Sequence, residues 1–438
     1  MKWKKLLGSA VLMVVVVAGG LLAYGHFAPR GADPVPPVAG VPADLNGAMS
    51  HGEYLAKAAD CVACHTARDG GKPYAGGRAF ALPFGTIYAT NLTPDKETGI
   101  GNWSDDAFVA AVREGVGSHG RLYPAMPYTS YVQMSRQDVL DIKKYLMTLE
   151  PVKQATPANT LSFPFNQRWG MAFWNAVFLD AKRYQPDAAK SEDWNRGAYL
   201  AGALGHCGEC HTPRNIGFAT KSHDYLAGAE IEGWKAYNTT SDDAYGLGDW
   251  TDAQLTGYLS RGHAPGRSSA AGPMAEVVEH SLQYLTQSDI HALVTYLRSV
   301  SPRTSEGSGE VNLDPATLKG ATAVLPANAA MAADNRGKLL FEGDCAGCHQ
   351  WDGAGRQTQY ASLKGSHAVN DPEGNALVQV ILNGTQLKVG GATQFMPGFG
   401  AIYSDKDIAA ISNYVLSHFG DQQGKVTAEQ VKKARQQP

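Results

Sequence analysis

The sequence predicts an all-α fold in which three tandem helical domains follow an amino-terminal signal or anchor segment. Three similar lead-in segments start at Gly52, Gly197 and Gly337, which are 145 (197 − 52) and 140 (337 − 197) residues apart. Each period is long enough for one domain. Each repeat closes with an amphipathic segment, headed by Ser or Thr, in which an aspartate precedes a tyrosine by seven residues: Asp138 and Tyr145, Asp289 and Tyr296, Asp407 and Tyr414. This pattern predicts three closing helices with capped amino termini.

The repeats set the expected domain boundaries. We expect a signal peptide or membrane anchor over residues 1–28, a Pro-rich linker over 29–47, domain 1 over 48–152, a connection over 153–190, domain 2 over 191–302, a linker over 303–332, domain 3 over 333–421 and a tail over 422–438. The connection contains FPFNQRWGMAFWNAVFLD, which is apolar on most faces. It predicts either a buried packing helix or a surface that faces a membrane or a partner.

All 6 cysteines lie in one kind of pentapeptide, C-x-x-C-H, which occurs three times. Two thiols at this spacing share a face of a helical turn, and the motif is the attachment sequence of haem c, with the histidine as an axial ligand of the iron. A zinc site would need a fourth ligand near each cluster, and a redox dithiol would not need the histidine. The sequence therefore predicts three covalently bound haem c groups on Cys61, Cys64 and His65, on Cys207, Cys210 and His211, and on Cys345, Cys348 and His349.

One methionine per repeat lies beside proline between the haem motif and the closing helix: Met126 in YPAMPY, Met274 in AGPMAE and Met396 in FMPGFG. Methionine is the usual sixth ligand of an electron-transferring haem, and proline stiffens a loop that must aim the thioether. Gap-filling core methionines are the alternative interpretation. Met134 and Met147 compete in the first repeat, and the histidines that could replace a methionine occupy no common position: His119, His206, His263, His280 and His367.

The amino terminus has the features of an export signal. Lys2, Lys4 and Lys5 precede an uncharged, largely apolar run over residues 6–24, which contains 19 residues and lacks a convincing cleavage site. Such a run approaches the length that spans a bilayer, so both a retained anchor and a cleaved signal stay open. Because haem is attached to cytochrome c outside the cytoplasm, we expect the chain from about Pro29 onward on the periplasmic side of the inner membrane.

Composition indicates an ordinary globular body, with 44% hydrophobic and 18% charged residues. Without the first 30 residues, the chain keeps 34 of its 38 basic residues against 41 acidic ones, a formal charge of −7. This excludes a basic footprint for nucleic acid.

The chain resembles the three-haem cytochrome c subunit of the membrane-bound dehydrogenases that oxidise alcohols, gluconate and related substrates in bacteria. The resemblance extends over the whole chain and includes NLTPDKETGIGNWSD, PAMPY and the apolar connection. It implies cytochrome-c-type domains and haem on the six cysteines, with axial His65, His211 and His349, and it supports Met126, Met274 and Met396 as sixth ligands. It also implies a catalytic partner subunit with a flavin or quinone cofactor, a small third subunit, and ubiquinone as the electron acceptor.

The three sites differ in one expected detail. Only the second has a proline two residues after its histidine, Pro213, whose carbonyl orients the imidazole in many such proteins. Which group orients the imidazole in the first and third sites therefore stays open.

Two functional classes follow from these motifs. The first is an electron-transfer subunit without catalytic residues of its own, whose partner oxidises the substrate. The alternative is a haem enzyme with an open coordination site, of the peroxidase or thiosulfate-oxidising type. The methionines favour the first class, and no dinucleotide-binding fingerprint is present.

Overall fold

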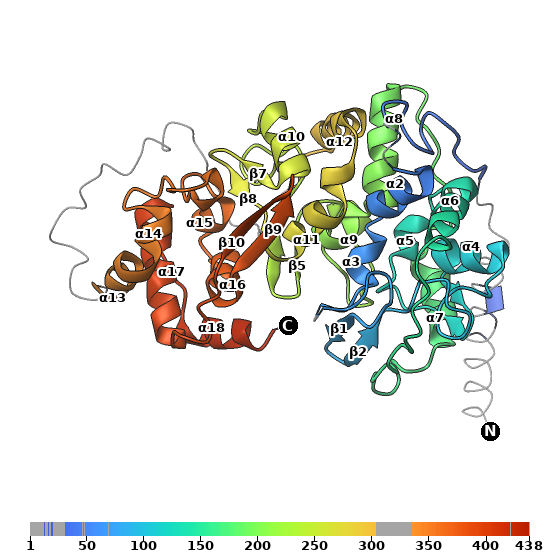
Figure 1. Ribbon diagram of the computed structural model, residues 1–438, viewed down its shortest axis with the longest axis horizontal. Coiled ribbons are helices and arrows are strands. Elements are labelled where there is room, and N and C mark those ends of the chain that lie inside the picture. Colours follow the sequence, from blue (N-terminus) through green and yellow to red (C-terminus); the bar gives the residue numbers. More distant parts are fainter. Residues whose placement is uncertain are drawn as a thin grey trace, which may run out of the picture. The chain divides into compact units, whose positions relative to one another are not determined.

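The computed structural model describes residues 31–45, 47, 49–68, 70–303, 335–420 and 422–437, together with Met13, Val16, Gly19 and Gly20 (Figure 1). The predicted signal or anchor segment and the predicted linker 303–332 therefore lie almost wholly outside the described residues. Among the helices of the described part of the chain, none is both long and apolar enough to cross a bilayer.

Contacts divide the described chain into two compact units. The first contains the described residues up to Glu209 together with Asn215–Ala219, and the second contains Cys210–Arg214 and the described residues from Thr220 onward. The first repeat thus shares a unit with the helix that opens the second repeat, while most of the second repeat shares a unit with the third. The division into three domains stays a prediction.

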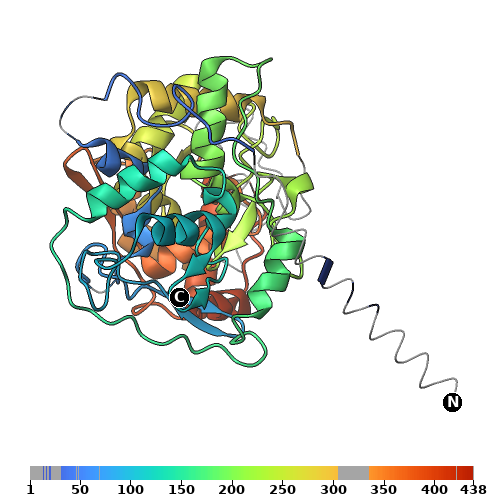
Figure 2. The same cartoon turned by 90° about the vertical axis from the view of Figure 1, so that its right-hand side faces the viewer.

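The first unit is mainly helical, and its elements can be followed in Figures 1 and 2. In chain order they are α2 (His51–Ala58), α3 (Cys61–Cys64), β1 (Ala79–Leu82), β2 (Gly85–Tyr88), α4 (Asp105–Glu114), β3 (Val116–Gly117), β4 (Gly120–Arg121), α5 (Tyr128–Tyr131), α6 (Arg136–Leu146), α7 (Gly170–Phe178), α8 (Glu192–Tyr199) and the π-helix η1 (Leu200–Leu204). Helix α9 (Cys207–His211) carries the second haem motif across the boundary of the two units.

The second unit contains most of the second repeat and the described part of the third, and the two share a helix, a two-stranded ribbon and a closing helix in that order. From the second repeat come η2 (Ser222–Asp224), β5 (Ala229–Ile231), β6 (Trp234–Ala236), α10 (Asp252–Arg261), β7 (His263–Ala264), β8 (Ser268–Ser269), α11 (Gly272–His280), η3 (Leu282–Tyr284) and α12 (Gln287–Ser299). From the third come α13 (Asn335–Leu340), η4 (Phe341–Cys345), α14 (Ala346–His349), η5 (Gln359–Ala361), α15 (His367–Asn370), α16 (Asn375–Asn383), β9 (Thr385–Val389), β10 (Ala392–Met396), α17 (Asp405–Phe419) and α18 (Ala428–Arg435).

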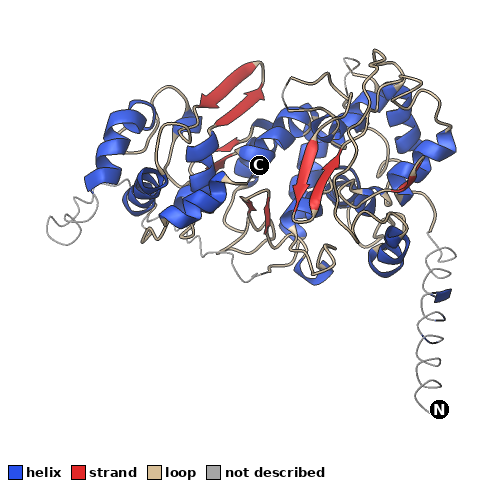
Figure 3. Cartoon of the chain, turned by 90° about the horizontal axis from the view of Figure 1, so that it is seen from below, coloured by secondary structure: helices blue, strands red, loops and turns tan. Residues whose placement is uncertain are grey.

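Short antiparallel ribbons join the helices, and Figure 3 shows them in red. Among the described residues there are five, each of two strands: β1–β2, β3–β4, β5–β6, β7–β8 and β9–β10. The expectation of an all-α fold is therefore right for the helices but missed these ribbons. Their strands contain only two to five residues, which is too short for a visible alternation of polar and apolar residues.

In the first and third repeats the opening helix crosses the closing helix at a glycine. A Cβ at Gly52 of α2 would lie 2.0 Å from the carbonyl oxygen of Asp141 in α6, and one at Gly337 of α13 would lie 2.1 Å from that of Ala410 in α17. These close approaches explain why the lead-ins of the first and third repeats both have a glycine here, because only glycine allows the two backbones to approach so closely. Apolar side chains including Phe341, Ile408 and Leu416 complete the core of the third repeat.

The predicted amino-terminal caps of the closing helices are confirmed. The hydroxyls of Ser135, Thr286 and Ser404 accept hydrogen bonds from the backbone N–H groups of the aspartates three residues later, at 3.0, 3.3 and 3.3 Å. The repeated aspartates then differ in their partners. Asp407 completes a capping box with Ser404, whereas Asp138 accepts the hydroxyl of Tyr199 in α8 at 2.5 Å.

Candidate haem sites

Each haem motif lies on a tight helical turn directly after its lead-in helix. The first occupies α3, the second α9, and the third the junction of η4 and α14. In the first two motifs the residue before the first cysteine adopts a left-handed backbone, with φ of 50° at Asp60 and 38° at His206. All six cysteines are free thiols. In the first two motifs both cysteines lie within one helical turn, α3 or α9, so that residues three apart share a face.

Each histidine predicted to be an axial ligand donates a hydrogen bond from Nδ1 to a backbone carbonyl. His65 donates to Thr90 at 2.7 Å, His211 to Tyr237 at 2.6 Å, and His349 to Ala361 at 2.7 Å. A carbonyl can only accept, so the proton resides on Nδ1 and Nε2 is free to bind a metal. Burial lowers the pKa of all three imidazoles, which keeps them neutral, as a metal ligand must be.

In the first two repeats a buried asparagine fixes the loop that supplies this carbonyl. Asn91 follows Thr90, accepts from Thr93 N–H and hydroxyl at 2.9 and 2.7 Å, and donates from Nδ2 to the carbonyl of Val152 at 2.7 Å. Asn238, which follows Tyr237, makes the equivalent bonds to Thr240 and to the carbonyl of Arg303. The Asn-x-Thr sequence is the local reason why the preceding carbonyl faces the histidine.

The third repeat supports its imidazole without an asparagine. Ala361 ends the short helix η5 and follows His349 by 12 residues, whereas Thr90 follows His65 by 25 and Tyr237 follows His211 by 26. A single turn of 3₁₀-helix replaces the longer loop there.

The expected role of Pro213 is wrong for this structure. Its carbonyl accepts from Lys221 N–H at 2.8 Å, while His211 donates to Tyr237. All three imidazoles have a carbonyl acceptor, so the expected difference between the sites in this respect is absent. Sequence reasoning missed Thr90, Tyr237 and Ala361 because a backbone acceptor leaves no side-chain signal. The recurrence of Asn-x-Thr in the first two repeats was the available clue.

The three candidate methionines follow equivalent elements. Each repeat has a helix that ends at a glycine with φ between 63° and 71° (Gly115, Gly262 or Gly384), then a two-stranded ribbon, with the methionine either after the ribbon or, in the third repeat, as its last residue. Met126 lies in the loop before α5, Met274 in the first turn of α11, and Met396 at the end of β10. Only Met126 lies in the loop that we expected for all three. All three side chains are half-buried, and their ligation of iron stays a prediction.

The competing residues have other surroundings. Met134 is fully buried in the core of the first unit, while Met147 is 40% exposed at the end of α6, so core packing does not explain it. The ring of His206 packs edge-on against Tyr131 at 5.5 Å, and His119 is exposed.

One buried donor of the second repeat fits a haem with its carboxylate side chains. Trp250 Nε1 is buried and has no hydrogen-bond partner within the described residues. A buried donor of this kind normally has an acceptor, which a haem propionate would provide. The thiols and free Nε2 atoms described above fit the same group. When bound, haem supplies one-electron redox chemistry, and this chain would hold it, orient its axial imidazole and shield it from water.

Comparison with known proteins bears on the identity of the chain. The cytochrome c family matches residues 49–150 and 335–419, which cover the first and third repeats. The chain is 41% identical to the fructose dehydrogenase cytochrome subunit of Gluconobacter japonicus, over 98% of this chain and 89% of that protein. This chain belongs to the family of dehydrogenase cytochrome c subunits.

Other members of the family agree. The gluconate 2-dehydrogenase cytochrome c subunit of Pantoea cypripedii is 39% identical over 88% of this chain and 89% of its own length. The alcohol dehydrogenase (quinone) cytochrome c subunit of Gluconobacter oxydans (strain 621H) is 35% identical over 88% of this chain and 82% of its own length. The predicted resemblance is confirmed, and with it covalent haem c and a function in electron transfer.

Proposed function

We propose that this chain is a three-haem electron-transfer subunit with one haem c in each repeat. The observation that carries the proposal is the recurrence of one site: a C-x-x-C-H turn whose histidine donates Nδ1 to a backbone carbonyl at 2.6–2.7 Å. Met126, Met274 and Met396 are the proposed sixth ligands, because each lies at the end of, or shortly after, the ribbon that follows a helix ending at a glycine with positive φ. The proposed domains are those expected from the sequence, at residues 48–152, 191–302 and 333–421.

Electrons enter from a catalytic dehydrogenase subunit, whose cofactor is a flavin or a quinone, and leave to ubiquinone. Support for a catalytic partner comes from relatives that are named as cytochrome subunits of fructose, gluconate and alcohol dehydrogenases. A small third subunit would complete the complex. In this scheme the chain has no catalytic residue, and its side chains hold and insulate the haems.

Two measurements test the number and ligation of the haems. Intact mass should exceed that of the polypeptide by three haems, and Cys207→Ser with Cys210→Ser should remove one. Exposure of the reduced protein to carbon monoxide should leave the spectrum nearly unchanged, because six-coordinate haems have no free position. A strong carbon monoxide adduct would instead favour the alternative, a haem enzyme with an open site.

We also place the chain on the periplasmic side of the inner membrane, with residues 1–28 as a signal or anchor. The exposed face of α7 is the proposed second contact with the membrane. Trp169, Phe173 and Val177 lie four residues apart on one face and are 67%, 39% and 59% exposed. Phe163 before the helix is 78% exposed. Aromatic and apolar side chains on one face are typical of a helix that lies in the interface of a bilayer.

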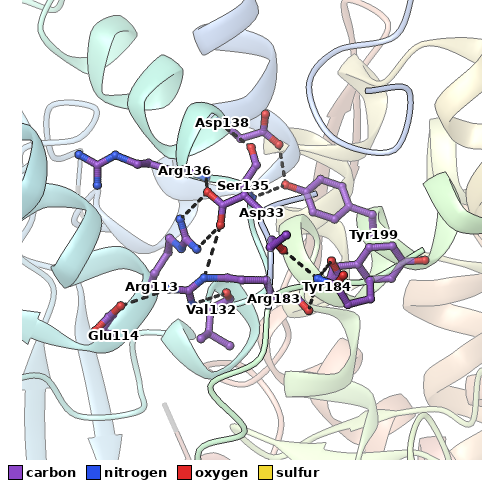
Figure 4. Close-up of polar contacts among 12 residues, drawn as sticks. Asp33, Arg113, Glu114, Val132, Ser135, Arg136, Asp138, Arg183, Tyr184 and Tyr199 are labelled. Carbon is purple, nitrogen blue, oxygen red and sulfur yellow. Dashed lines mark hydrogen bonds and ion pairs between the residues drawn. The ribbon is translucent and has the colours of Figure 1, made fainter. Parts of the chain in front are cut away.

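The point where the amino-terminal segment joins the first unit favours a bilayer as the occupant of this face. Asp33 binds the nearly buried guanidinium of Arg113 at 2.6 Å and the backbone N–H of Arg136 at 2.8 Å (Figure 4). The side chain of Gln185 donates to the carbonyl of Ala32 at 2.8 Å. Because Gln185 is seven residues beyond Phe178, the attachment point lies within roughly 25 Å of the end of α7. An anchor would therefore hold this face near the membrane.

Liposome flotation of a protein that lacks residues 1–30, exported behind a foreign cleavable signal, tests the α7 contact. We expect the wild-type body to float with zwitterionic phosphatidylcholine liposomes, and Trp169→Ser, Phe173→Ser and Val177→Ser together to abolish flotation. Leu339→Ser with Ile402→Ser removes other exposed apolar side chains and should have no effect. Equal flotation of all variants would refute the role of α7.

A further inference from the structure

The loop that orients the second axial histidine is also bound by the third repeat. The carbonyl of Tyr237 accepts from His211, and the half-buried Tyr237 ring meets the ring of His367 edge-on, with centroids 5.2 Å apart at 89°. The Tyr237 hydroxyl lies 3.5 Å from Asp371 Oδ2. Trp250 of the second repeat contacts the same His367 ring at 5.5 Å.

An ion pair fixes the strand that leads into this loop. Lys235 in β6 lies 3.2 Å from Asp371 and 3.3 Å from Glu373, and the Asp371 side chain is fully buried. A buried carboxylate without its cation would be costly, so the pair strongly favours one position of β6 on the third repeat. Tyr237, two residues after Lys235, is thereby held from outside its own repeat.

In the opposite direction, the second repeat contacts the loop of the third repeat that orients His349. Tyr360 precedes Ala361, the acceptor for His349, and its hydroxyl donates to the carbonyl of Arg261 in the second repeat at 2.6 Å. Its ring lies 4.7 Å from that of His263. A Cβ at Gly365 would lie 2.1 Å from the carbonyl oxygen of Gly266, so the two backbones touch beside this contact.

Within the described residues, no contact from another repeat is found on the corresponding loop of the first repeat, at Thr90 and Asn91. Thr90 is positioned by bonds within its own unit: Asn91 donates to Val152, and Tyr88 N–H donates to the side chain of Asn159 at 3.1 Å. The first haem site therefore serves as an internal reference for the other two.

We propose that the second and third repeats form a reciprocal latch, in which each repeat positions the axial imidazole of the other through Tyr237 and Tyr360. These are positioning residues, because each acts through a backbone carbonyl rather than on the iron. The inference rests on the proposed haem ligation. Its functional consequence is that the redox potentials of the two haems depend on docking of the two repeats, since the Nδ1 hydrogen bond tunes how strongly the imidazole donates to iron.

The test measures the second haem after a change in the third repeat. His367→Ala removes the ring that supports Tyr237, so the Nδ1 bond of His211 should weaken and the potential of the second haem should rise. The ferric EPR signal of that haem should shift as well, while the first haem keeps its potential and signal. His367→Phe retains an edge-on aromatic contact and should restore the wild-type values.

Two further variants complete the test. Tyr360→Phe removes only the hydroxyl that bonds to Arg261, and the third haem alone should shift. Asp405→Asn removes a carboxylate of the third repeat that pairs with Arg435, and it should leave the second haem unchanged. Haem content by mass separates the two proposals: fewer than three haems in the wild type would contradict the proposed ligation. With three haems present, an unshifted second haem in His367→Ala, or an unshifted third haem in Tyr360→Phe, would overturn the latch.

Discussion

The first and third repeats share one helical frame but orient their histidines with different loops. In both, the opening and closing helices cross at a glycine, and a Cβ would lie 2.0 or 2.1 Å from a backbone oxygen. The imidazole acceptor is Thr90 on a long loop fixed by Asn91 in the first repeat, and Ala361 on one turn of 3₁₀-helix in the third. The helix crossing therefore sets the position of the haem turn, while the loop has only to present one carbonyl.

The prediction with the largest expected effect tests the close crossing of the opening and closing helices in the first and third repeats. Gly52→Ala and Gly337→Ala should each lower the free energy of unfolding by about 3 kcal/mol, because overpacked helix contacts force the backbones apart. Denaturant unfolding followed by circular dichroism measures this loss. Gly343→Ala is the matched control, since no atom lies within 4 Å of its added Cβ. If Gly343→Ala and Gly337→Ala were equally destabilising, the close crossing would not be the cause.

A second prediction concerns pH and separates the third repeat from the first. Burial, with Arg267 and Lys235 nearby, lowers the pKa of His367 to about 4. The unfolded chain binds this proton near pH 6.5, so stability should fall as pH decreases from 6.5 to 4 and stay level above pH 7. The total change is about 3 kcal/mol, at about 1.4 kcal/mol per pH unit. Urea unfolding of the wild type and of His367→Phe over this pH range measures the change in stability. The variant should lack the loss of stability at low pH that is due to His367, because phenylalanine does not titrate.

The third prediction tests the loop of the first repeat. Asn91→Ala leaves the buried N–H of Thr93 without its acceptor and should cost about 2 kcal/mol. The potential of the first haem should rise, because Thr90 then holds His65 less firmly. Asn102→Ala removes an exposed asparagine of the same segment and should be nearly neutral. A change in the third haem would contradict the separation of the two loops.

Sequence reasoning succeeded where side chains carry the information. The C-x-x-C-H motifs lie on helical turns, and the Ser or Thr before each closing helix is its cap. It failed where the backbone acts, as at Ala361 and Tyr237, because any residue can supply a carbonyl. It also left the exposure of α7 undecided, since an apolar helix such as Gly170–Phe178 has the same composition whether it faces a core or a membrane.

The prediction with the smallest expected effect asks whether the amino-terminal caps of the two closing helices, α6 and α17, contribute equally to stability. Ser135→Ala and Ser404→Ala each remove the hydroxyl that accepts the third N–H of the closing helix, at 3.0 and 3.3 Å, and should each cost about 1 kcal/mol. Ser404→Asp keeps an acceptor and should retain most of the stability, although its carboxylate lies beside Asp407. Thermal unfolding is the measurement. A loss at Ser135 but none at Ser404 would mean that the third repeat relies on the Asp407 side chain, which also accepts the backbone N–H of Ser404, to fix the start of α17.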